Sequence, residues 1–303
     1  MRKLILVISS SVVCGIVGVI VVGGVLAAPR QQEVGAPPID LPAESVVISR
    51  EGAQSISGWF VAGNSEQAGV LLLHSVRSNR REMIGRARFL HDAGYSVLLI
   101  DMQGHGETPG EHITFGYLES LDAHDALEYL QSRVFGRSVG VIGVSLGGAA
   151  ALLGATPVQA DALVLESVYS SFERAVQNRI AIRLGDFGRY LAPLLLWQVE
   201  PRLGIPLESL SPVAAIPRLA APVMIIAGTD DRHTLSDESQ ELYSLAPEPK
   251  SLWMVKGARH QNLHRYAPQD YERRVLGFLD EHLQQGGIET ASHRPAPWHD
   301  RDL

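Results

Sequence analysis

The chain has 303 residues, of which 46% are hydrophobic and 19% charged, the composition of a packed globular protein rather than of a disordered one. A formal net charge of −7 and the absence of a Lys/Arg cluster beside aromatic residues exclude nucleic acid as an expected partner. The single cysteine, Cys14, excludes a disulfide framework, a redox pair and a thiolate metal cage. Any chemistry must therefore use oxygen and nitrogen groups.

An uncharged stretch, residues 4–28, follows Arg2 and Lys3. About 20 helical residues cross the roughly 30 Å hydrocarbon core of a bilayer, so this stretch predicts a transmembrane helix acting as a signal-anchor. The basic residues before it and the acidic residues after it place the remaining chain, including any catalytic domain, on the extracytoplasmic side. Cleavage of a signal peptide near Ala28, which would give a secreted protein, is the alternative.

Residues 29–44 contain four prolines and predict a semi-rigid linker. From residue 45 to 285, β-rich runs alternate with helical ones. This alternation indicates an α/β fold, with a mostly parallel eight-stranded sheet flanked by helices. The expected strands are 46–49, 56–61, 70–75, 95–101, 138–144, 162–167, 223–227 and 251–255, and the expected helices are 80–93, 115–133, 146–153, 237–246 and 268–285.

Residues 169–210 interrupt this alternation with helical stretches rich in Leu, Ile, Phe and Tyr, which predicts an inserted helical lid. One hypothesis is that its apolar residues form a wall against an acyl chain, and ordinary packing of the lid on the body is the equal alternative. The residues concerned are Ile180, Ile182, Leu184, Phe187, Tyr190, Leu194, Leu195 and Trp197. Residues 286–303 have no periodicity and predict a disordered tail.

The sharpest local motif is Gly-x-Ser-x-Gly at 143–147, centred on Ser145. It follows a buried apolar run and precedes small residues that allow a helix to pack closely on the sheet. A nucleophile elbow needs this context, because its serine lies on a strained strand-to-helix turn. Ser138 sits in a second match to the pattern, but that match precedes the apolar run and places Ser138 at a loop-to-strand junction. A structural serine in a tight turn is the alternative interpretation of Ser145.

Five segments together resemble the α/β-hydrolase superfamily, most closely its serine-aminopeptidase-like and monoacylglycerol-lipase-like branch. They are LLLHS at 71–75, DMQGHGET at 101–108, GVSLGG at 143–148, SP at 211–212 with APVMIIAGTDD at 221–231, and GARH at 257–260. The resemblance covers residues 45–285 and implies an α/β-hydrolase fold. It also implies a Ser-acid-His triad in that order along the chain, with Asp231 in the position of the acid.

The physical roles agree with this order. A serine hydroxyl becomes a good nucleophile when an imidazole accepts its proton, and the imidazole needs a carboxylate to fix its tautomer. His260, in the loop after the last predicted strand, fits the base, and Asp231 fits the orienting acid. Asp230 remains the rival carboxylate, and His264 or His233 the rival base.

Attack on an acyl carbonyl also requires two preorganised N–H donors for the developing oxyanion. Leu146 supplies the first from the elbow. The resemblance places the second after the third strand, where Val76 is the matching donor. Ser75 stands where the family usually has glycine, so either the loop takes a different path or the Ser75 hydroxyl contributes a hydrogen bond. We expect His74 to brace the loop backbone.

The sequence therefore predicts a serine hydrolase of the carboxylesterase or lipase type that cleaves acyl esters without a cofactor. Thioesters, small amides and lipid-derived acyl substrates stay open. Asp101 and His105 are expected to be structural turn residues. A metal site at His105, Glu107, Glu111 and His112 is disfavoured, because the cluster lacks helical ligand spacing.

Two other functions stay open. An aminopeptidase would use acidic residues such as Glu166, Glu173 or Asp186 to hold an ammonium group, and a catalytically silent domain would only bind.

Overall fold

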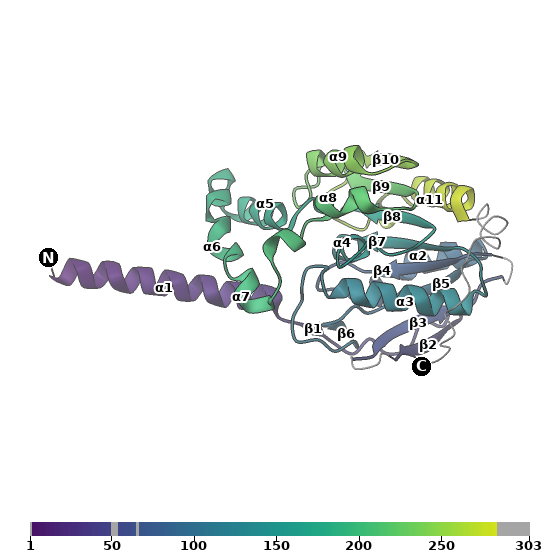
Figure 1. Cartoon of the computed structure of the whole chain (residues 1–303), viewed down its shortest axis with the longest axis horizontal. Helices are drawn as coiled ribbons and strands as arrows, with labels where there is room; N and C mark the ends of the chain where they lie inside the picture. The colour runs from purple at the N-terminus through teal and green to yellow at the C-terminus, as the bar shows by residue number, and fades with distance from the viewer. Residues whose placement is uncertain (1, 50–53, 65–66, 284–303) are drawn as a thin grey trace, which may run out of the picture.

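The computed structural model describes residues 2–49, 54–64 and 67–283 of the chain (Figure 1). The disordered tail predicted for residues 286–303 lies outside these residues. Eight strands form the main sheet in the order β10-β9-β8-β7-β4-β5-β3-β2. The strands are β2 (Ala43–Ile48), β3 (Ile56–Val61), β4 (Gly69–Leu73), β5 (Ser96–Ile100), β7 (Val139–Val144), β8 (Ala162–Glu166), β9 (Val223–Gly228) and β10 (Lys250–Val255).

All pairings in this sheet are parallel except those of β3, which runs antiparallel to both β2 and β5. Strands β4, β5, β7 and β8 are buried along their whole length, which explains their continuous runs of Val, Leu and Ile. The prediction of a mostly parallel eight-stranded sheet is therefore confirmed.

Helices cover both faces of the sheet and bury two separate apolar clusters against it. Helices α3 (Glu119–Arg133) and α4 (Leu146–Leu152) contribute Ala123, Leu127 and Ala149 to one cluster. Helices α2 (Ile84–Asp92) and α11 (Pro268–Leu283) contribute Leu90 and Val275 to the other. The remaining short elements of the body are η1 (Arg80–Met83), α8 (Pro212–Ala215), η4 (Ile216–Arg218), α9 (Ser236–Leu245) and α10 (Leu263–Tyr266).

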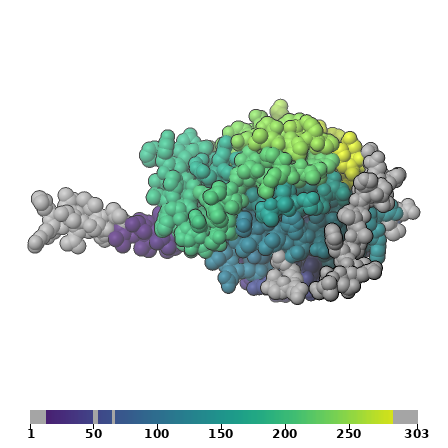
Figure 2. Space-filling model, viewed as in Figure 1, coloured from purple at the N-terminus to yellow at the C-terminus, as the bar shows by residue number. Residues whose placement is uncertain are grey.

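The predicted lid is present between β8 and β9. It consists of α5 (Phe172–Leu184), η2 (Asp186–Leu191), α6 (Ala192–Leu196), α7 (Val199–Leu203) and η3 (Leu207–Ser209). Figure 1 shows these elements as a group at one end of the sheet, beside the C-terminal end of α1 (Arg2–Ala27). The space-filling view in Figure 2 shows α1 emerging from beneath the lid.

The transmembrane anchor predicted for residues 4–28 has no support in the structure. Over the part of the chain that the structure describes, no helix combines the length and the apolarity needed to cross a membrane. The C-terminal end of α1 instead packs against the body of the α/β domain, where Ala27 is buried and its carbonyl accepts a hydrogen bond from the Ile113 N–H at 2.8 Å.

The proline-rich segment also packs on the body, in contrast to the predicted spacer. Strand β1 (Arg30–Gln31) pairs in parallel with β6 (His105–Gly106). The Glu107 carboxylate accepts hydrogen bonds from the N–H groups of Val34 and Gly35, both at 2.9 Å, and Val34 is buried. Long-range partners of this kind leave no periodic pattern in the sequence, which explains why residues 29–44 resemble a free linker.

Candidate active site

Ser145 lies on a sharp turn between β7 and α4, with backbone angles φ 51° and ψ −106°. A positive φ is uncommon for a residue with a side chain and indicates a strained turn. The flanking glycines permit it. A Cβ at Gly143 would lie 2.5 Å from the Gly148 nitrogen, and one at Gly147 would lie 2.4 Å from the Leu73 carbonyl oxygen. Ser138 immediately precedes the first residue of β7, so it lies at the opposite end of the strand.

His260 and Asp231 form a hydrogen-bonded pair. The distance from His260 Nδ1 to Asp231 Oδ2 is 2.7 Å. The other carboxylate oxygen accepts the backbone N–H groups of His233 at 2.8 Å and Thr234 at 3.0 Å. Burial opposes ionisation of Asp231, but the hydrogen bonds outweigh it and lower the pKa of its carboxyl below the ordinary value. With Nδ1 directed at this carboxylate, His260 Nε2 is left to accept a proton.

The rival residues have other partners. His264 Nε2 lies 2.7 Å from a carboxylate oxygen of Glu272, and its ring packs between Phe89 and Tyr271. Asp230 is exposed and accepts a hydrogen bond from its neighbour Thr229. The His233 ring lies beside the His260 ring, with 4.9 Å between their centroids, while its backbone binds Asp231. The geometry therefore favours His260 and Asp231 over their rivals.

Ser145, Asp231 and His260 follow β7, β9 and β10, so all three lie at the carboxyl edge of one sheet. This is the edge where open α/β sheets bind ligands. Among the residues that the structure describes, no hydrogen bond joins the Ser145 hydroxyl to His260. Catalytic hydrogen bonds are often long in unliganded enzymes and shorten when substrate binds. The structure thus establishes the His260–Asp231 pair and the Ser145 elbow as two separate elements of the site.

The loop after β4 is held by a carboxylate that the sequence analysis missed. Glu82 Oε2 accepts both the Ser75 N–H at 2.9 Å and the Ser75 hydroxyl at 2.7 Å. The Ser75 hydroxyl is therefore bound to Glu82. The residue with a positive φ in this loop is Arg77, at 60°, rather than Ser75. Val76, held between them, lines the same cavity as Ser145 and Leu146. Leu146 is the first residue of α4, so the helix offers its N–H no internal acceptor.

His74 braces this loop, as predicted. Its Nε2 accepts the Met102 N–H at 3.1 Å, so Nδ1 carries the proton and donates to the Ser75 carbonyl at 2.7 Å. Burial lowers the pKa of His74, which keeps the ring neutral. Both ring nitrogens are occupied by backbone groups, and His74 is therefore a structural residue.

A cavity of about 130 Å³ opens beside Ser145, and we call it the Ser145 cavity. Its lining is mostly apolar and comes from five parts of the chain: Leu26, Val76, Arg77, Phe115, Ser145, Leu146, Tyr169, Phe172, Ala175, Val176 and Arg179. The charged residues in this lining are both cationic. Arg77 donates to the Val25 carbonyl at 3.0 Å and Arg179 to the Ala175 carbonyl at 3.0 Å.

The hypothesis that apolar lid residues form a wall against an acyl chain is wrong for most of the residues named. Phe187 is 78% exposed and Tyr190 77%, and four others also face outward: Ile182, Leu184, Leu194 and Trp197. The lid contributes instead through the first turns of α5, where Phe172, Ala175 and Val176 share one helical face. Glu238 fixes the start of this segment, because it accepts the Ser170 N–H at 3.0 Å and the Asn178 side chain at 2.6 Å.

The acidic residues considered for an aminopeptidase lie elsewhere. Glu166 is buried in an ion pair with Arg86, 2.5 Å apart, and Tyr271 also donates to it. Glu173 accepts a hydrogen bond from Gln177 on the surface of α5, and Asp186 is 95% exposed. None of the three lines the Ser145 cavity.

The turn after β5 is structural, as predicted. The buried Asp101 carboxylate accepts the Arg80 N–H at 2.7 Å, the Arg80 guanidinium and the Glu107 N–H at 2.9 Å. Burial lowers the pKa of His105 to about 4, so the ring is neutral. Glu111 and His112 are exposed, and the described residues contain no group of three or more His, Cys, Asp or Glu arranged to hold a metal ion.

The fold and the elbow serine define a protein of the α/β class with a candidate nucleophile at the carboxyl edge of its sheet. A family model described as the alpha/beta hydrolase family matches residues 70–274. The chain therefore belongs to the alpha/beta hydrolase family.

Comparisons with individual proteins agree with this family. The chain is 31% identical over 227 residues to the uncharacterized protein Rv2307c of Mycobacterium tuberculosis, covering 73% of this chain and 74% of that protein. It is 24% identical over 241 residues to the uncharacterized protein YqkD of Bacillus subtilis, covering 77% and 78%. Among solved structures, the esterase Pf2001 of Pyrococcus furiosus has a TM-score of 0.69 at 24% identity and covers 85% of this chain and 98% of its own. At this identity the structural likeness shows the fold alone.

Proposed function

We propose that this protein is a serine hydrolase that cleaves acyl esters through an acyl-enzyme intermediate. Ser145 is the nucleophile, His260 the general base and Asp231 the group that orients the base. The observation that carries the proposal is the strained Ser145 elbow, which opens on an apolar cavity at the sheet edge shared with the His260–Asp231 pair. The match of residues 70–274 to the alpha/beta hydrolase family supports the same reaction class.

In the proposed reaction the Ser145 oxygen bonds to the acyl carbon while His260 Nε2 takes the serine proton. The N–H groups of Leu146 and Val76 stabilise the resulting oxyanion. Collapse of this intermediate breaks the carbon–oxygen bond to the alcohol, which leaves with the proton held by His260. A water molecule then attacks the acyl carbon of the acyl-enzyme while His260 takes its proton, and His260 returns that proton to the Ser145 oxygen as the acid is released.

An ester substrate suits the cavity better than an amino-terminal peptide does. A substrate ammonium would need an acidic partner, but the charged residues that line the Ser145 cavity are Arg77 and Arg179. Thioesters and small amides without a positive charge follow the same mechanism and belong in the same assay. Aminoacyl p-nitroanilides serve as the comparison, and preference for them would favour the aminopeptidase branch.

Labelling with a fluorophosphonate tests the proposal directly. We expect an adduct on the full chain and on Ser138→Ala, because Ser138 lies at the far end of β7. We expect none on Ser145→Ala. Labelling that survives Ser145→Ala, or an intact chain that fails to label, would contradict the assignment and favour a catalytically silent binding domain.

The location of the chain stays a prediction of the sequence, both for the extracytoplasmic membrane-bound form and for the secreted form. Expression with a carboxyl-terminal tag followed by carbonate extraction separates them. Retention in the pellet at full length would support membrane attachment, and a released chain shortened near Ala28 would support cleavage.

A further inference from the structure

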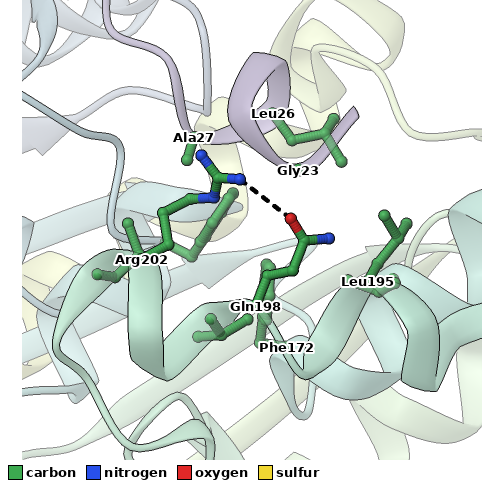
Figure 3. Close-up of a pocket in the computed structure, with 11 residues that line it drawn as sticks. Gly23, Leu26, Ala27, Phe172, Leu195, Gln198 and Arg202 are labelled. Atoms are coloured by element: carbon green, nitrogen blue, oxygen red, sulfur yellow. Dashed lines mark hydrogen bonds between the residues drawn. The ribbon is translucent and has the colours of Figure 1, made fainter. Parts of the chain in front are cut away.

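A second cavity adjoins the Ser145 cavity, and helix α1 forms one of its sides. It measures about 30 Å³ and lies between the C-terminal turns of α1 and the lid (Figure 3), and we call it the helix cavity. The two cavities share four lining residues, all of them apolar: Leu26, Phe115, Phe172 and Val176. The two cavities therefore lie side by side, and Leu26, which is 43% exposed, belongs to the apolar wall that they share.

Helix α1 is seated on the lid through a pair of glycines. A Cβ at Gly23 would lie 2.5 Å from Gln198 Oε1, and one at Gly24 would lie 3.2 Å from Arg202 Nη1. Because Gly23 and Gly24 have no Cβ atoms, the side chains of Gln198 and Arg202 can reach the backbone of α1. Gln198 donates to the Val19 carbonyl at 3.0 Å and Arg202 to the Ile20 carbonyl at 2.9 Å.

The same helix is tied to the predicted oxyanion loop. Arg77 donates to the Val25 carbonyl, which belongs to the last turn of α1, where helix carbonyls lack internal partners. A cation at a helix C-terminus is also favoured by the helix dipole. Lid, helix and loop are thus fixed relative to one another, with Leu26 between them.

Polar groups lie on the far side of the shared wall. Figure 3 shows Gln198 and Arg202 hydrogen-bonded to each other opposite Gly23, and the distance between Arg202 Nη2 and Gln198 Oε1 is 3.0 Å. Leu195 completes the apolar lining just before this pair. An aliphatic chain that extended from Ser145 across the shared wall would meet mostly apolar side chains, and Gln198 and Arg202 would be the first polar groups on the far side.

We propose that α1 is part of the substrate site, and that Leu26 selects the acyl chain of the ester by its place between the two cavities. This inference rests on the proposed ester hydrolysis and assigns its acyl side. The substrate class is the ester of an unbranched aliphatic acid of short to medium length, with Gln198 and Arg202 setting the upper limit. Each methylene that fits is expected to raise kcat/KM by about fourfold.

The test uses the full chain and p-nitrophenyl esters from acetate to decanoate. Leu26→Trp adds volume to the shared wall, and we expect kcat/KM for octanoate to fall at least tenfold while that for acetate changes less than about twofold. Val21→Trp is the matched control, because Val21 is exposed on the same helix but lines neither cavity, and its chain-length profile should equal that of the wild type. A uniform loss on all esters, or an unchanged profile, would overturn the inference.

A second variant guards against misfolding of the tryptophan variant. Leu26→Ala removes volume from the shared wall, and we expect decanoate to gain at least threefold relative to butyrate. If this ratio stays at the wild-type value, the inference is overturned even when Leu26→Trp does not fold.

A binding measurement separates this inference from the proposed reaction. If no ester is hydrolysed in a Ser145-dependent way, the proposed reaction is wrong. The acyl site is then tested separately, by measuring whether decanoate raises the Tm of the protein. We expect decanoate to raise the Tm of the wild type and of Val21→Trp, but not that of Leu26→Trp. The absence of a shift in the wild type, or an equal shift in Leu26→Trp, would overturn the inference.

Discussion

The carboxyl edge of the sheet and the lid side of the Ser145 cavity hold their residues by different forces. At the sheet edge, two pairs of polar side chains are joined by hydrogen bonds: His260 binds Asp231, and Ser75 binds Glu82. On the lid side, the cavity is lined by apolar side chains such as Phe172 and Val176, while Phe187 and Tyr190 face outward. The candidate catalytic groups are thus positioned by directional hydrogen bonds, and the wall of the cavity is positioned by nondirectional packing.

This difference predicts two kinds of mutational response. Loss of one hydrogen bond at the sheet edge should change catalysis while leaving the fold intact, because each bond orients a particular atom. Loss of an apolar group on the lid side should change stability or chain-length preference in proportion to the volume buried.

The largest effect is expected at the orienting carboxylate. Asp231→Asn keeps the shape but removes the charge and reverses the hydrogen bond to His260, so kcat on p-nitrophenyl butyrate should fall by about 10⁴. Asp230→Asn, next to it and exposed, should stay within about twofold of the wild type. Equal losses in the two variants would show that Asp231 has no orienting role.

The buried histidine of the turn after β5 should produce the next largest effect, seen in stability against pH. The pKa of His105 is about 4 in the folded chain and 6.5 ordinarily, so between these values the unfolded chain binds more protons. The free energy of unfolding is therefore expected to fall as the pH drops from 6.5 to 4, by about 3 kcal/mol from this residue.

Urea unfolding at pH 7 and pH 4.5 measures the His105 effect. His105→Gln should lose less stability than the wild type between the two pH values, whatever its stability at pH 7. Parallel losses in the two proteins would contradict the prediction and assign the acid sensitivity to other groups.

A smaller catalytic effect is expected at the loop that carries Val76. Glu82→Gln replaces a charged acceptor by a neutral one, which weakens the bonds to Ser75 and loosens the backbone N–H of Val76. We expect kcat to fall about 10-fold to 100-fold with KM nearly unchanged, since the oxyanion forms only in the transition state. A change confined to KM would show that the loop binds substrate instead.

The smallest effect is expected on the outer surface of the lid. Phe187→Ala should change the free energy of unfolding by less than about 0.5 kcal/mol, because the ring is 78% exposed. Phe172→Ala, its buried counterpart on the cavity side, should cost about 3 kcal/mol. Chemical unfolding of both variants checks this contrast, and a large loss at Phe187 would mean that the lid packs differently.

Much of the fold was predictable because it depends on local patterns. β-rich runs, several of them continuously apolar, marked the eight strands, and the small residues around Ser145 marked the elbow, since only residues without a bulky Cβ fit there. The order Ser145, Asp231, His260 came from the resemblance to the α/β-hydrolase superfamily, and the positions of these residues after strands agreed with it. Glu82 was not found, because an exposed-looking acid at the start of a helix carries no pattern that reveals a partner seven residues away.

What the sequence by itself determined is the sheet, the strained serine turn and the identity of the groups at the carboxyl edge, because these depend on neighbours in the chain. Only the tertiary structure decided which residues line the cavity, that Glu166 forms an ion pair with Arg86, and that α1 contributes Leu26 to the cavity wall. The physical reason is that packing and ion pairs join residues far apart in sequence, and such contacts impose no period or spacing on the chain.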